Sequence, residues 1–413
     1  MHRSGAAACV VVAMASAACS SAGHSNPTPA RSAANGSASA AHLVNVKIGV
    51  LTDLTGPAAS GDKTFVNGIR AGVVLARRQG YDIKYVVGDA QTSPTGALSA
   101  AQRMVTRDGV PIVLTQSALT FAAAPYLKAR NIPVIGIAED ASEWGSDLNM
   151  FPIEGALHTT AVTTTFGQLF KLLGGTTIGS LGYGISPSSS DSAKAAVLSA
   201  QDAGLAKGYL NANFTFGSTN VQPIALAMKN ARADAVYASV DPNTGFALVR
   251  ELRQIGARLK AVVLPDGYGA DTLQAGPGAL ADAQNVYFSL GYEPVEMKVP
   301  ETKAFVDDLR ESGTTGVPTF GEYNGYVSVG LLLRALKSAP AVSSAALMTT
   351  LSGIHDWDAL GLWGGRKIDI NDREHVLMTS QCSWVTKLVG SDFQLVPGAD
   401  PICGKTLSIT TKS

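Results

Sequence analysis

The sequence predicts an α/β protein built as two Rossmann-like lobes with parallel-sheet cores, and three observations support this. Strand, turn and helix recur along the chain in two consecutive series, which is typical of βαβ units whose parallel sheet is covered on both faces. With 413 residues, the chain exceeds the roughly 250 to 300 residues at which a single core stops growing. The 43 glycines and the aromatic content of only 7% suit close-packed sheet and helix layers with many turns.

The first series of elements begins at Val44. A short apolar strand, Val46–Leu51, is followed by a turn-rich stretch and by a helix over Phe65–Arg78. Further along, the pattern predicts strands at 82–88, 112–115 and 134–138, and helices at 94–108 and 120–129.

The second series begins after Phe151. Its pattern predicts strands at 177–183, 235–240 and 261–265, and helices at 159–173, 191–203, 221–230 and 244–255. The remaining stretch is less regular. We expect two amphipathic helices, at 301–312 and 323–338, and terminal strands within 375–396 that are joined by the turn Val389–Asp392.

Charge patterning argues against nucleic acid as a partner. Lys and Arg together number 32, as do Asp and Glu, so the formal net charge is zero. Neither sign forms a long run that could follow a phosphate backbone. The composition indicates a globular protein and does not identify a ligand.

The start of the chain predicts export. His2 and Arg3 precede a short apolar stretch, which ends in small residues before Cys19, as in a bacterial lipoprotein signal. The stretch is shorter than the roughly 20 apolar residues that a permanent membrane helix needs. We therefore expect residues 1–19 to form a lipoprotein signal with Cys19 as the lipidated residue, although Ser16 stands where such signals usually carry Leu. An ordinary secretory signal cut near Ala18 is the alternative.

Residues 20–43 are expected to form a flexible tether, because Ser, Ala, Gly, Asn and Pro dominate them and large apolar side chains are almost absent. Cys9 would leave with the signal, so Cys382 and Cys403 are the only remaining pair. Outside the cytoplasm a disulfide between them is expected. Two unrelated buried thiols are the alternative.

Several segments, taken in order, resemble one known family. They are Leu51–Pro57, Gly61-Asp62, Asp89–Gln91, Asn131–Ile135, Pro265–Gly267 and the helix from Tyr323 to Lys337. This series resembles the leucine/isoleucine/valine-binding branch of type I periplasmic solute-binding proteins, the receptors that deliver solutes to ABC transporters. The resemblance extends over nearly all of residues 44–396.

The resemblance implies that the chain crosses between the lobes three times and that the ligand lies in the hinged cleft. We accordingly expect residues 44–155 and 292–375 to form one lobe, and residues 156–291 and 376–413 to form the other. Members of this family are monomers that bind a solute and ABC permease subunits. We therefore expect this chain to be a monomer with the same partners, and to contact the membrane only through the lipid anchor.

Polar residues follow the strands of the first lobe, where ligands of open α/β sheets bind. Gln116, Ser117 and Ala118 come after one strand, and a hydroxyl with free amides at a helix start suits a carboxylate. By the resemblance, Ser117 would hold the ligand's α-carboxylate; an ordinary helix cap is the alternative. Glu139 and Asp140 follow the next strand, where the family has small residues, and would favour an extra cationic or donor group on the ligand. A solvated acidic turn or a capping pair is the alternative for Glu139 and Asp140.

In the second lobe the corresponding positions are Tyr183, Ser189, Asp241 and Asp266. Asp266 matches the acidic residue that pairs with the ligand ammonium in the family, a charge-assisted contact; a Pro-Asp-Gly turn is the alternative. With Ser60 from the turn after the first strand, the complete set of predicted ligand contacts is Ser60, Gln116, Ser117, Ala118, Glu139, Asp140, Tyr183, Ser189, Asp241 and Asp266.

The sequence gives little support for an enzyme. Three of the six histidines lie in the signal or tether, and the chain contains no Gly-x-Ser-x-Gly elbow, Walker loop or Cys/His metal spacing. We therefore expect no catalysis, metal or cofactor. The predicted function is an extracytoplasmic lipoprotein that captures a small amino acid, amide or related polar solute for an ABC importer. A receptor of the same fold that passes ligand binding to a signalling partner is the alternative.

Overall fold

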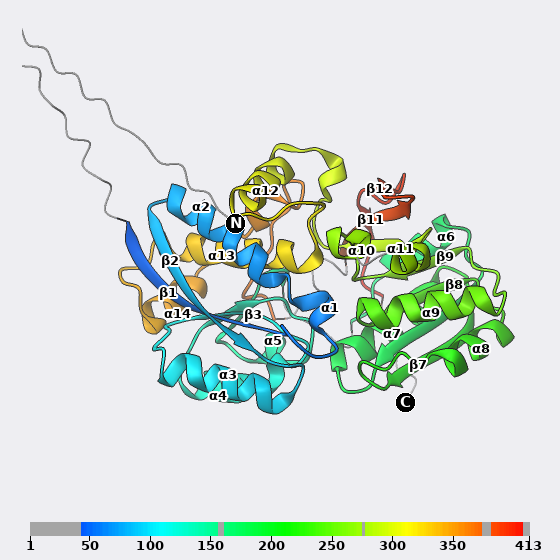
Figure 1. Ribbon diagram of the computed structural model, residues 1–413, viewed down its shortest axis with the longest axis horizontal. Helices are drawn as coiled ribbons and strands as arrows, with labels where there is room; N and C mark the ends of the chain where they lie inside the picture. The colour runs from blue at the N-terminus through cyan, green and yellow to red at the C-terminus, as the bar shows by residue number, and fades with distance from the viewer. Residues whose placement is uncertain (1–42, 156–160, 275–276, 374–380, 408–413) are drawn as a thin grey trace, which may run out of the picture. The chain divides into compact units, whose positions relative to one another are not determined.

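The computed structural model describes residues 43–155, 161–274, 277–373 and 381–407, and its α/β architecture with two sheets confirms the predicted fold class (Figure 1). The predicted signal peptide, Cys19 and all but the last residue of the predicted tether lie outside the described residues. Within those residues, no helix is both long enough and apolar enough to cross a membrane.

The first sheet has five parallel strands in the order β2-β1-β3-β4-β5. The strands are β1 (Val44–Thr52), β2 (Tyr81–Asp89), β3 (Val113–Gln116), β4 (Val134–Gly136) and β5 (Met150–Pro152). The helices between them are α1 (Ala59–Asp62), α2 (Phe65–Arg78), α3 (Pro94–Thr106), α4 (Ala124–Ala129) and α5 (Glu143–Ser146), with a 3-10 turn, η1, at Thr120–Ala122.

Alternation along β1 explains how helices cover both faces of this sheet. Val46, Ile48 and Val50 belong to the cluster that contains Phe65 and Ile69 of α2. Leu51 instead packs into a separate cluster with α3. The long helix α13 (Phe320–Leu336) returns from late in the chain to pack on α2, β3 and β4. The helices α12 (Pro300–Glu311) and α14 (Ser344–Leu351) pack beside α2 and α13 respectively.

The second sheet follows the order β12-β11-β10-β9-β8-β6-β7, with β13 paired to β11. Strands β6 (Thr177–Tyr183), β7 (Ala206–Phe214), β8 (Ala235–Ser239), β9 (Ala261–Leu264) and β10 (Tyr287–Leu290) are parallel. Strands β11 (Cys382–Val389), β12 (Asp392–Leu395) and β13 (Ile402–Cys403) pair antiparallel. The helices are α6 (Thr165–Leu172), α7 (Pro187–Asp202), α8 (Gln222–Asn230), α9 (Pro242–Gln254), α10 (Ala270–Gln274) and α11 (Pro277–Ala283).

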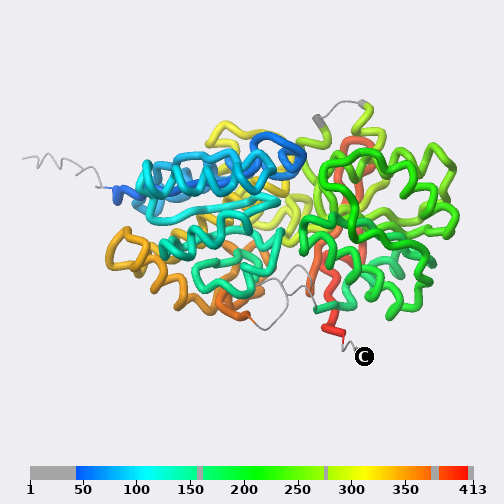
Figure 2. The backbone as a smooth tube through the Cα atoms, turned by 90° about the horizontal axis from the view of Figure 1, so that it is seen from below, coloured from blue at the N-terminus to red at the C-terminus, as the bar shows by residue number. Residues whose placement is uncertain are grey.

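The chain therefore passes between the two sheets three times: after β5, after β10 and before β11. We call residues 44–155 with α12–α14 the first lobe, and the elements of the second sheet with α6–α11 the second lobe. Figure 2 shows the last described residues, in red, running along the second lobe. Two short 3-10 turns, η2 (Val295–Met297) and η3 (Ala359–Gly361), lie in the part of the chain that returns to the first lobe.

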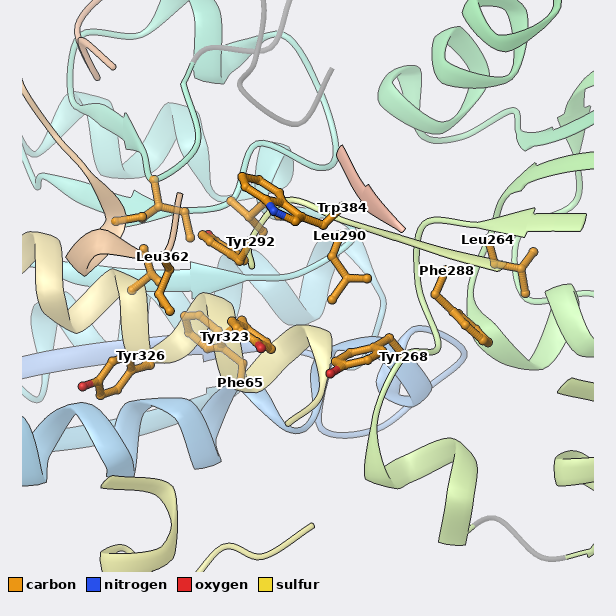
Figure 3. Packing of buried hydrophobic residues seen from close by; sticks show 14 of the residues in the cluster. Phe65, Leu264, Tyr268, Phe288, Leu290, Tyr292, Tyr323, Tyr326, Leu362 and Trp384 are labelled. Carbon is orange, nitrogen blue, oxygen red and sulfur yellow. The ribbon is translucent and has the colours of Figure 1, made fainter. Parts of the chain in front are cut away.

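One hydrophobic cluster continues from the first lobe into the second through the passage after β10. Tyr292 in this passage stacks on Tyr323 of α13, with ring centroids 5.6 Å apart, and on Trp363, with centroids 6.2 Å apart. Figure 3 shows Tyr292 and Tyr323 close together, and Phe288 and Leu264 of the second lobe to the right of them. Aromatic stacking therefore fixes the passage against the first lobe.

The predicted disulfide is present, between Cys382 of β11 and Cys403 of β13, with the two Cα atoms 4.1 Å apart. It joins two strands that are already paired.

Several predicted elements differ from those observed. The expected helix at 120–129 is a 3-10 turn followed by α4, which starts beside Pro125 at its N-terminus. The helices expected from 191 and 244 begin earlier, at Pro187 and Pro242, because Ser186 and Asp241 cap them. Among the described residues, nine helices and strands had not been predicted: α1, α5, β5, β7, α10, α11, β10, α14 and β13.

Candidate functional site

The two sheets share one strand order, so each has its crevice at the corresponding position in the sheet. The first sheet follows the order 2-1-3-4-5, and strands β7-β6-β8-β9-β10 of the second sheet repeat that order. In such sheets, ligands bind outside the carboxyl ends of the strands, where the strand order reverses. Here the crevices of the two lobes share one cavity of about 270 Å³.

The cavity lining comes from both lobes. The first lobe contributes Ala58, Asp62, Ala118 and Glu139, and the second contributes Tyr183, Ser189, Asp241 and Asp266. Helix α1 of the first lobe also contacts α9 of the second (Figure 1). The hydroxyl of Ser60 in α1 donates a long hydrogen bond of 3.4 Å to Asp241 Oδ1. A ligand in this cavity would touch both lobes.

Three carboxylates dominate the electrostatics of the cavity: Asp62, Glu139 and Asp266. Burial, reinforced by repulsion from Asp53, raises the pKa of Asp62 well above its usual range. Burial, followed by repulsion from Asp62, does the same to the pKa of Glu139. Burial raises the pKa of Asp266 to about 7, against the hydrogen bond from the Gly267 amide. These groups are close enough to disfavour one another's ionised forms.

Asp62 and Asp266 approach each other from opposite lobes at Gly61. A Cβ atom on Gly61 would lie 2.2 Å from Asp266 Oδ2, so only glycine allows this approach without a shift. Asp62 Oδ1 accepts a hydrogen bond of 2.9 Å from Gln116 Nε2. Gln116 Oε1 in turn accepts one of 3.1 Å from Asn324 of α13, so Gln116 fixes Asp62 from behind.

The backbone amides after β3 are engaged by the protein itself, which differs from the free amides that the sequence predicted there. Asp53 Oδ2 accepts from the Ala118 amide at 3.0 Å, and Ser117 Oγ accepts from the Leu119 amide at 3.3 Å. Asp140 Oδ2 accepts from the Phe121 amide at 2.6 Å. Two buried carboxylates of this chain therefore occupy the region where a ligand carboxylate was expected.

Asp140 is part of this internal network. Its Oδ1 accepts from the indole Nε1 of Trp144 at 2.8 Å, and its backbone carbonyl accepts from the Ser188 amide of α7 at 3.1 Å. Burial raises the pKa of the neighbouring Glu143 to about 9, with repulsion from Asp140 as the next cause. At neutral pH Glu143 is therefore protonated beside Asp140.

On the second lobe, Asp241 combines a helix cap with a cavity wall. Its Oδ1 accepts from the Thr244 amide at 3.2 Å, and its Oδ2 accepts from the Thr244 hydroxyl at 2.9 Å and from the Tyr183 hydroxyl. Burial and the proximity of Asp241 raise the pKa of Tyr183, so its phenol keeps the proton that it donates.

Ser189 joins three elements through one hydroxyl. Its Oγ accepts from the Tyr183 amide of β6 at 2.7 Å and donates to the Ser239 carbonyl of β8. The Ser189 side chain faces the cavity, but its hydrogen-bonding capacity is largely used within the lobe.

Aromatic rings line the rest of the cavity in the second lobe. Phe166 of α6 lies against Tyr237 of β8, with ring centroids 4.9 Å apart. Phe216, just after β7, lies against Tyr183, with centroids 4.6 Å apart. The cavity thus offers flat apolar surfaces beside its carboxylates.

Six of the ten predicted contacts line the cavity: Ala118, Glu139, Tyr183, Ser189, Asp241 and Asp266. Ser60 reaches it only through Asp241. Gln116, Ser117 and Asp140 are buried behind the wall and support it. The ligand-contact role of all ten residues stays a prediction.

Several residues that line the cavity had not been predicted from the sequence. Asp62 stood in a recognised motif, but the sequence pattern gave no reason to select it over Ser60 in the same stretch after the first strand. Phe166 and Tyr237 lie inside a helix and a strand, where apolar periodicity predicts only a core. Phe216 follows β7, a strand that the sequence pattern did not reveal. Among the residues that the structure describes, no group of three or more His, Cys, Asp or Glu is arranged to hold a metal ion.

Comparisons with known proteins agree with this architecture. A family model described as "Periplasmic binding protein" matches residues 45–392. No curated protein matches the chain.

Several solved structures are similar to this chain. One is a possible leucine/isoleucine/valine-binding protein from Rhodopirellula baltica, with a TM-score of 0.72 and 17% identity over 87% of this chain and 98% of that one. A second is a solute-binding protein of an ABC transporter from R. palustris in complex with 4-hydroxybenzoate, with a TM-score of 0.71 and 16% identity over 85% and 96% of the two chains. A third is the branched-chain amino acid transporter substrate-binding protein of Streptococcus pneumoniae in complex with isoleucine, with a TM-score of 0.67 and 18% identity over 88% and 99%. At these identities the likeness concerns the fold.

Proposed function

The chain belongs to the periplasmic binding protein family, since the family model matches most of its length, and from that premise we propose that it is the solute-binding protein of an ABC importer. It captures a small polar solute between its lobes and presents the closed form to permease subunits. Amino acids and amides are the first solute classes to test. The protein acts by binding and performs no chemistry on the solute.

The observation that supports this proposal most directly is a single cavity with polar groups from both lobes. Asp62 and Glu139 come from the first lobe, and Asp241 and Asp266 come from the second. A solute that contacts both sets binds the closed arrangement more tightly than an open one, and this difference in affinity is what drives closure.

The passages between the sheets give the hinge a structural basis. The passage after β10 is held to the first lobe by the stacking of Tyr292 on Tyr323 and Trp363. The second lobe would then turn about this fixed end, with the φ/ψ change absorbed by a few residues at element ends.

We also propose the domain arrangement and location that the sequence predicts. Residues 44–155 and 292–375 form one lobe, and residues 156–291 and 376–413 form the other. Cys19 carries the lipid that anchors the protein to the outer face of the cell membrane, and residues 20–43 tether the lobes to it.

A solute screen combined with a closure assay tests the function. Specific binding raises the melting temperature by mass action, and closure lowers the radius of gyration measured by small-angle X-ray scattering. Gly61→Val should abolish the compaction and weaken binding at least tenfold, since the side chain would collide with Asp266. Gly278→Val is the matched control, because nothing lies within 4 Å of a Cβ there. If solutes bind the Gly61→Val variant as tightly as the wild type, or leave the radius of gyration of the wild type unchanged, the proposed mechanism is wrong.

A further inference from the structure

We propose that the solute is a small organic cation, an amine that carries no carboxylate, held by carboxylates from both lobes. This inference rests on the proposed function and narrows it to one chemical class. It differs from the ligands bound in two of the similar structures, which are 4-hydroxybenzoate and isoleucine.

Carboxylates from both lobes face the cavity. Asp62 and Glu139 face the cavity from the first lobe, and Asp266 faces it from the second. Each of the three has its pKa raised first by burial and further by repulsion from other acids. A cation placed among these groups restores their ionised forms, whereas an anion adds repulsion.

One carboxylate oxygen in the cavity wall lacks a hydrogen-bond donor. Glu139 Oε1 is enclosed and has no hydrogen-bond partner among the described residues. Leaving a buried charged acceptor unpaired is unfavourable, and an ammonium or amidinium N–H would supply the missing donor. In the described part of the chain, Asp62 accepts from Gln116 and is hydrogen-bonded to Asp53, Asp266 accepts from the Gly267 amide, and neither carboxylate has a cationic partner.

The backbone amides after β3, where a ligand carboxylate was expected, already have acceptors within the protein. The amides of Ala118, Leu119 and Phe121 already donate to Asp53, Ser117 and Asp140. A ligand carboxylate at this edge would have to displace a protein carboxylate that is buried and hydrogen-bonded. The wall therefore supplies its own anions where an amino acid would need to place one.

Glu154, Asp191 and Asp241 also line the cavity, and the proposed cation site does not depend on them. Asp191 forms an ion pair of 2.8 Å with Lys194, and Asp241 accepts from Tyr183 and Thr244.

Size and shape favour an organic cation over a metal ion. The cavity of about 270 Å³ has room for a molecule of several heavy atoms. Its aromatic walls at Phe166, Tyr237 and Phe216 suit an apolar body, and a ring face near a cation adds attraction. An amine with an aromatic or aliphatic body matches both parts of the lining.

A series of nearly isosteric probes tests the inference directly. The cation 4-hydroxybenzylamine, the neutral 4-hydroxybenzamide and the anion 4-hydroxybenzoate differ mainly in charge. A parallel aliphatic series consists of 1,5-diaminopentane, L-leucine and glutarate, and Mg²⁺ and Ca²⁺ complete the panel. Binding to the purified protein is measured by thermal shift and calorimetry at pH 7.5. We expect the amine in at least one series to bind at least tenfold more tightly than its neutral, zwitterionic or anionic counterparts.

Variants locate the effect at the proposed residues. Glu139→Gln and Asp266→Asn should each weaken amine binding by about 10- to 100-fold, which corresponds to one charge-assisted hydrogen bond. Both variants should gain affinity for the neutral amide relative to the amine. Asp307→Asn, which removes an exposed carboxylate on α12, is the matched control and should bind the amine like the wild type.

The outcomes separate this inference from the proposed function. If leucine, an amide, an anion or a divalent metal ion binds more tightly than the amines, the cation inference is wrong. If that tighter ligand is leucine, an amide or an organic anion, the proposed solute-binding function still holds. If no probe of any charge shifts the melting temperature at millimolar concentration and native mass spectrometry finds no co-purified small molecule, both are overturned.

Discussion

The two lobes share one strand order but line the cavity with different chemistry. In both, the order 2-1-3-4-5 places a crevice at the carboxyl ends of the strands. The first lobe fills its crevice with buried acids, and its backbone amides donate to two of them, Asp53 and Asp140. The second lobe offers hydroxyl groups, aromatic rings and the three acids Asp191, Asp241 and Asp266.

This difference shows that strand order determines where a site lies, while the residues after each strand determine what it binds. The lobes also differ in how they end. The second lobe adds antiparallel strands β11, β12 and β13 and a disulfide to its parallel sheet, and the first lobe is completed by α12, α13 and α14. Four predictions test these contrasts.

The largest expected effect is a dependence of stability on pH that originates at Asp266. Its pKa of about 7 in the folded protein lies above the roughly 3.9 of an unfolded chain. The folded state therefore holds a proton that the unfolded state loses, and stability falls as pH rises through this window, by about 4 kcal/mol between pH 4 and pH 8. Asp241 and Asp271 add to the repulsion on Asp266.

Asp266→Asn should remove this part of the pH dependence and be the more stable protein at pH 8 in the absence of solute. Urea unfolding of both proteins across this range measures the difference. Parallel stability curves for the two proteins would contradict the assignment.

The disulfide should stabilise the second lobe by about 3 kcal/mol, because it closes a loop between residues 21 positions apart. The double variant Cys382→Ser with Cys403→Ser should lower the free energy of unfolding by this amount. Hydrogen exchange should report faster opening in β11–β13 and little change in β1–β5. Equal loss of protection in both lobes would show that the lobes unfold as one unit.

Asp140 tests whether the acids of the first lobe support structure as well as charge. Asp140→Ala leaves the Phe121 amide and the buried Trp144 indole without an acceptor and should cost about 2 kcal/mol. Asp140→Asn keeps an acceptor oxygen for one of the two donors and should therefore cost less. Chemical unfolding of both variants measures this difference, and equal losses would mean that the hydrogen bonds are not the cause.

The smallest effect is expected at Ser189, which carries the comparable structural role in the second lobe. Ser189→Ala should cost about 1 kcal/mol, because the Tyr183 amide and the Ser239 carbonyl lose their partner. Ser188→Ala on the same helix is the control, since the Ser188 hydroxyl makes no hydrogen bond among the described residues. Thermal unfolding distinguishes them; identical melting temperatures would contradict the role given to Ser189.

Local signals in the sequence predicted most of the fold. The apolar run of β1 and the periodic helix α2 were both found, because each pattern reflects burial that the sequence itself encodes. The strand β7 escaped notice, because its residues are mostly half-buried or exposed and alternate weakly. Short strands such as β5 depend on neighbours for pairing, so three residues carry too little pattern to predict them.

The candidate site was predictable where strand ends coincide with the cavity, as at Glu139, Asp241 and Asp266. It was not predictable where a residue's role depends on what lies opposite. Ser117 and Asp140 follow strands as expected, yet the packing turns their side chains to donors within the first lobe.

By itself, the sequence determined the α/β class, the two series of elements, the pairing partners of the disulfide and several of the strand ends that line the cavity, because these follow from local periodicity and residue type. The tertiary structure alone decided which carboxylates meet in one cavity and which backbone amides remain for a ligand. Those outcomes depend on distances between residues far apart in the chain, such as Asp62 and Asp266, and on burial that only the packed lobes create.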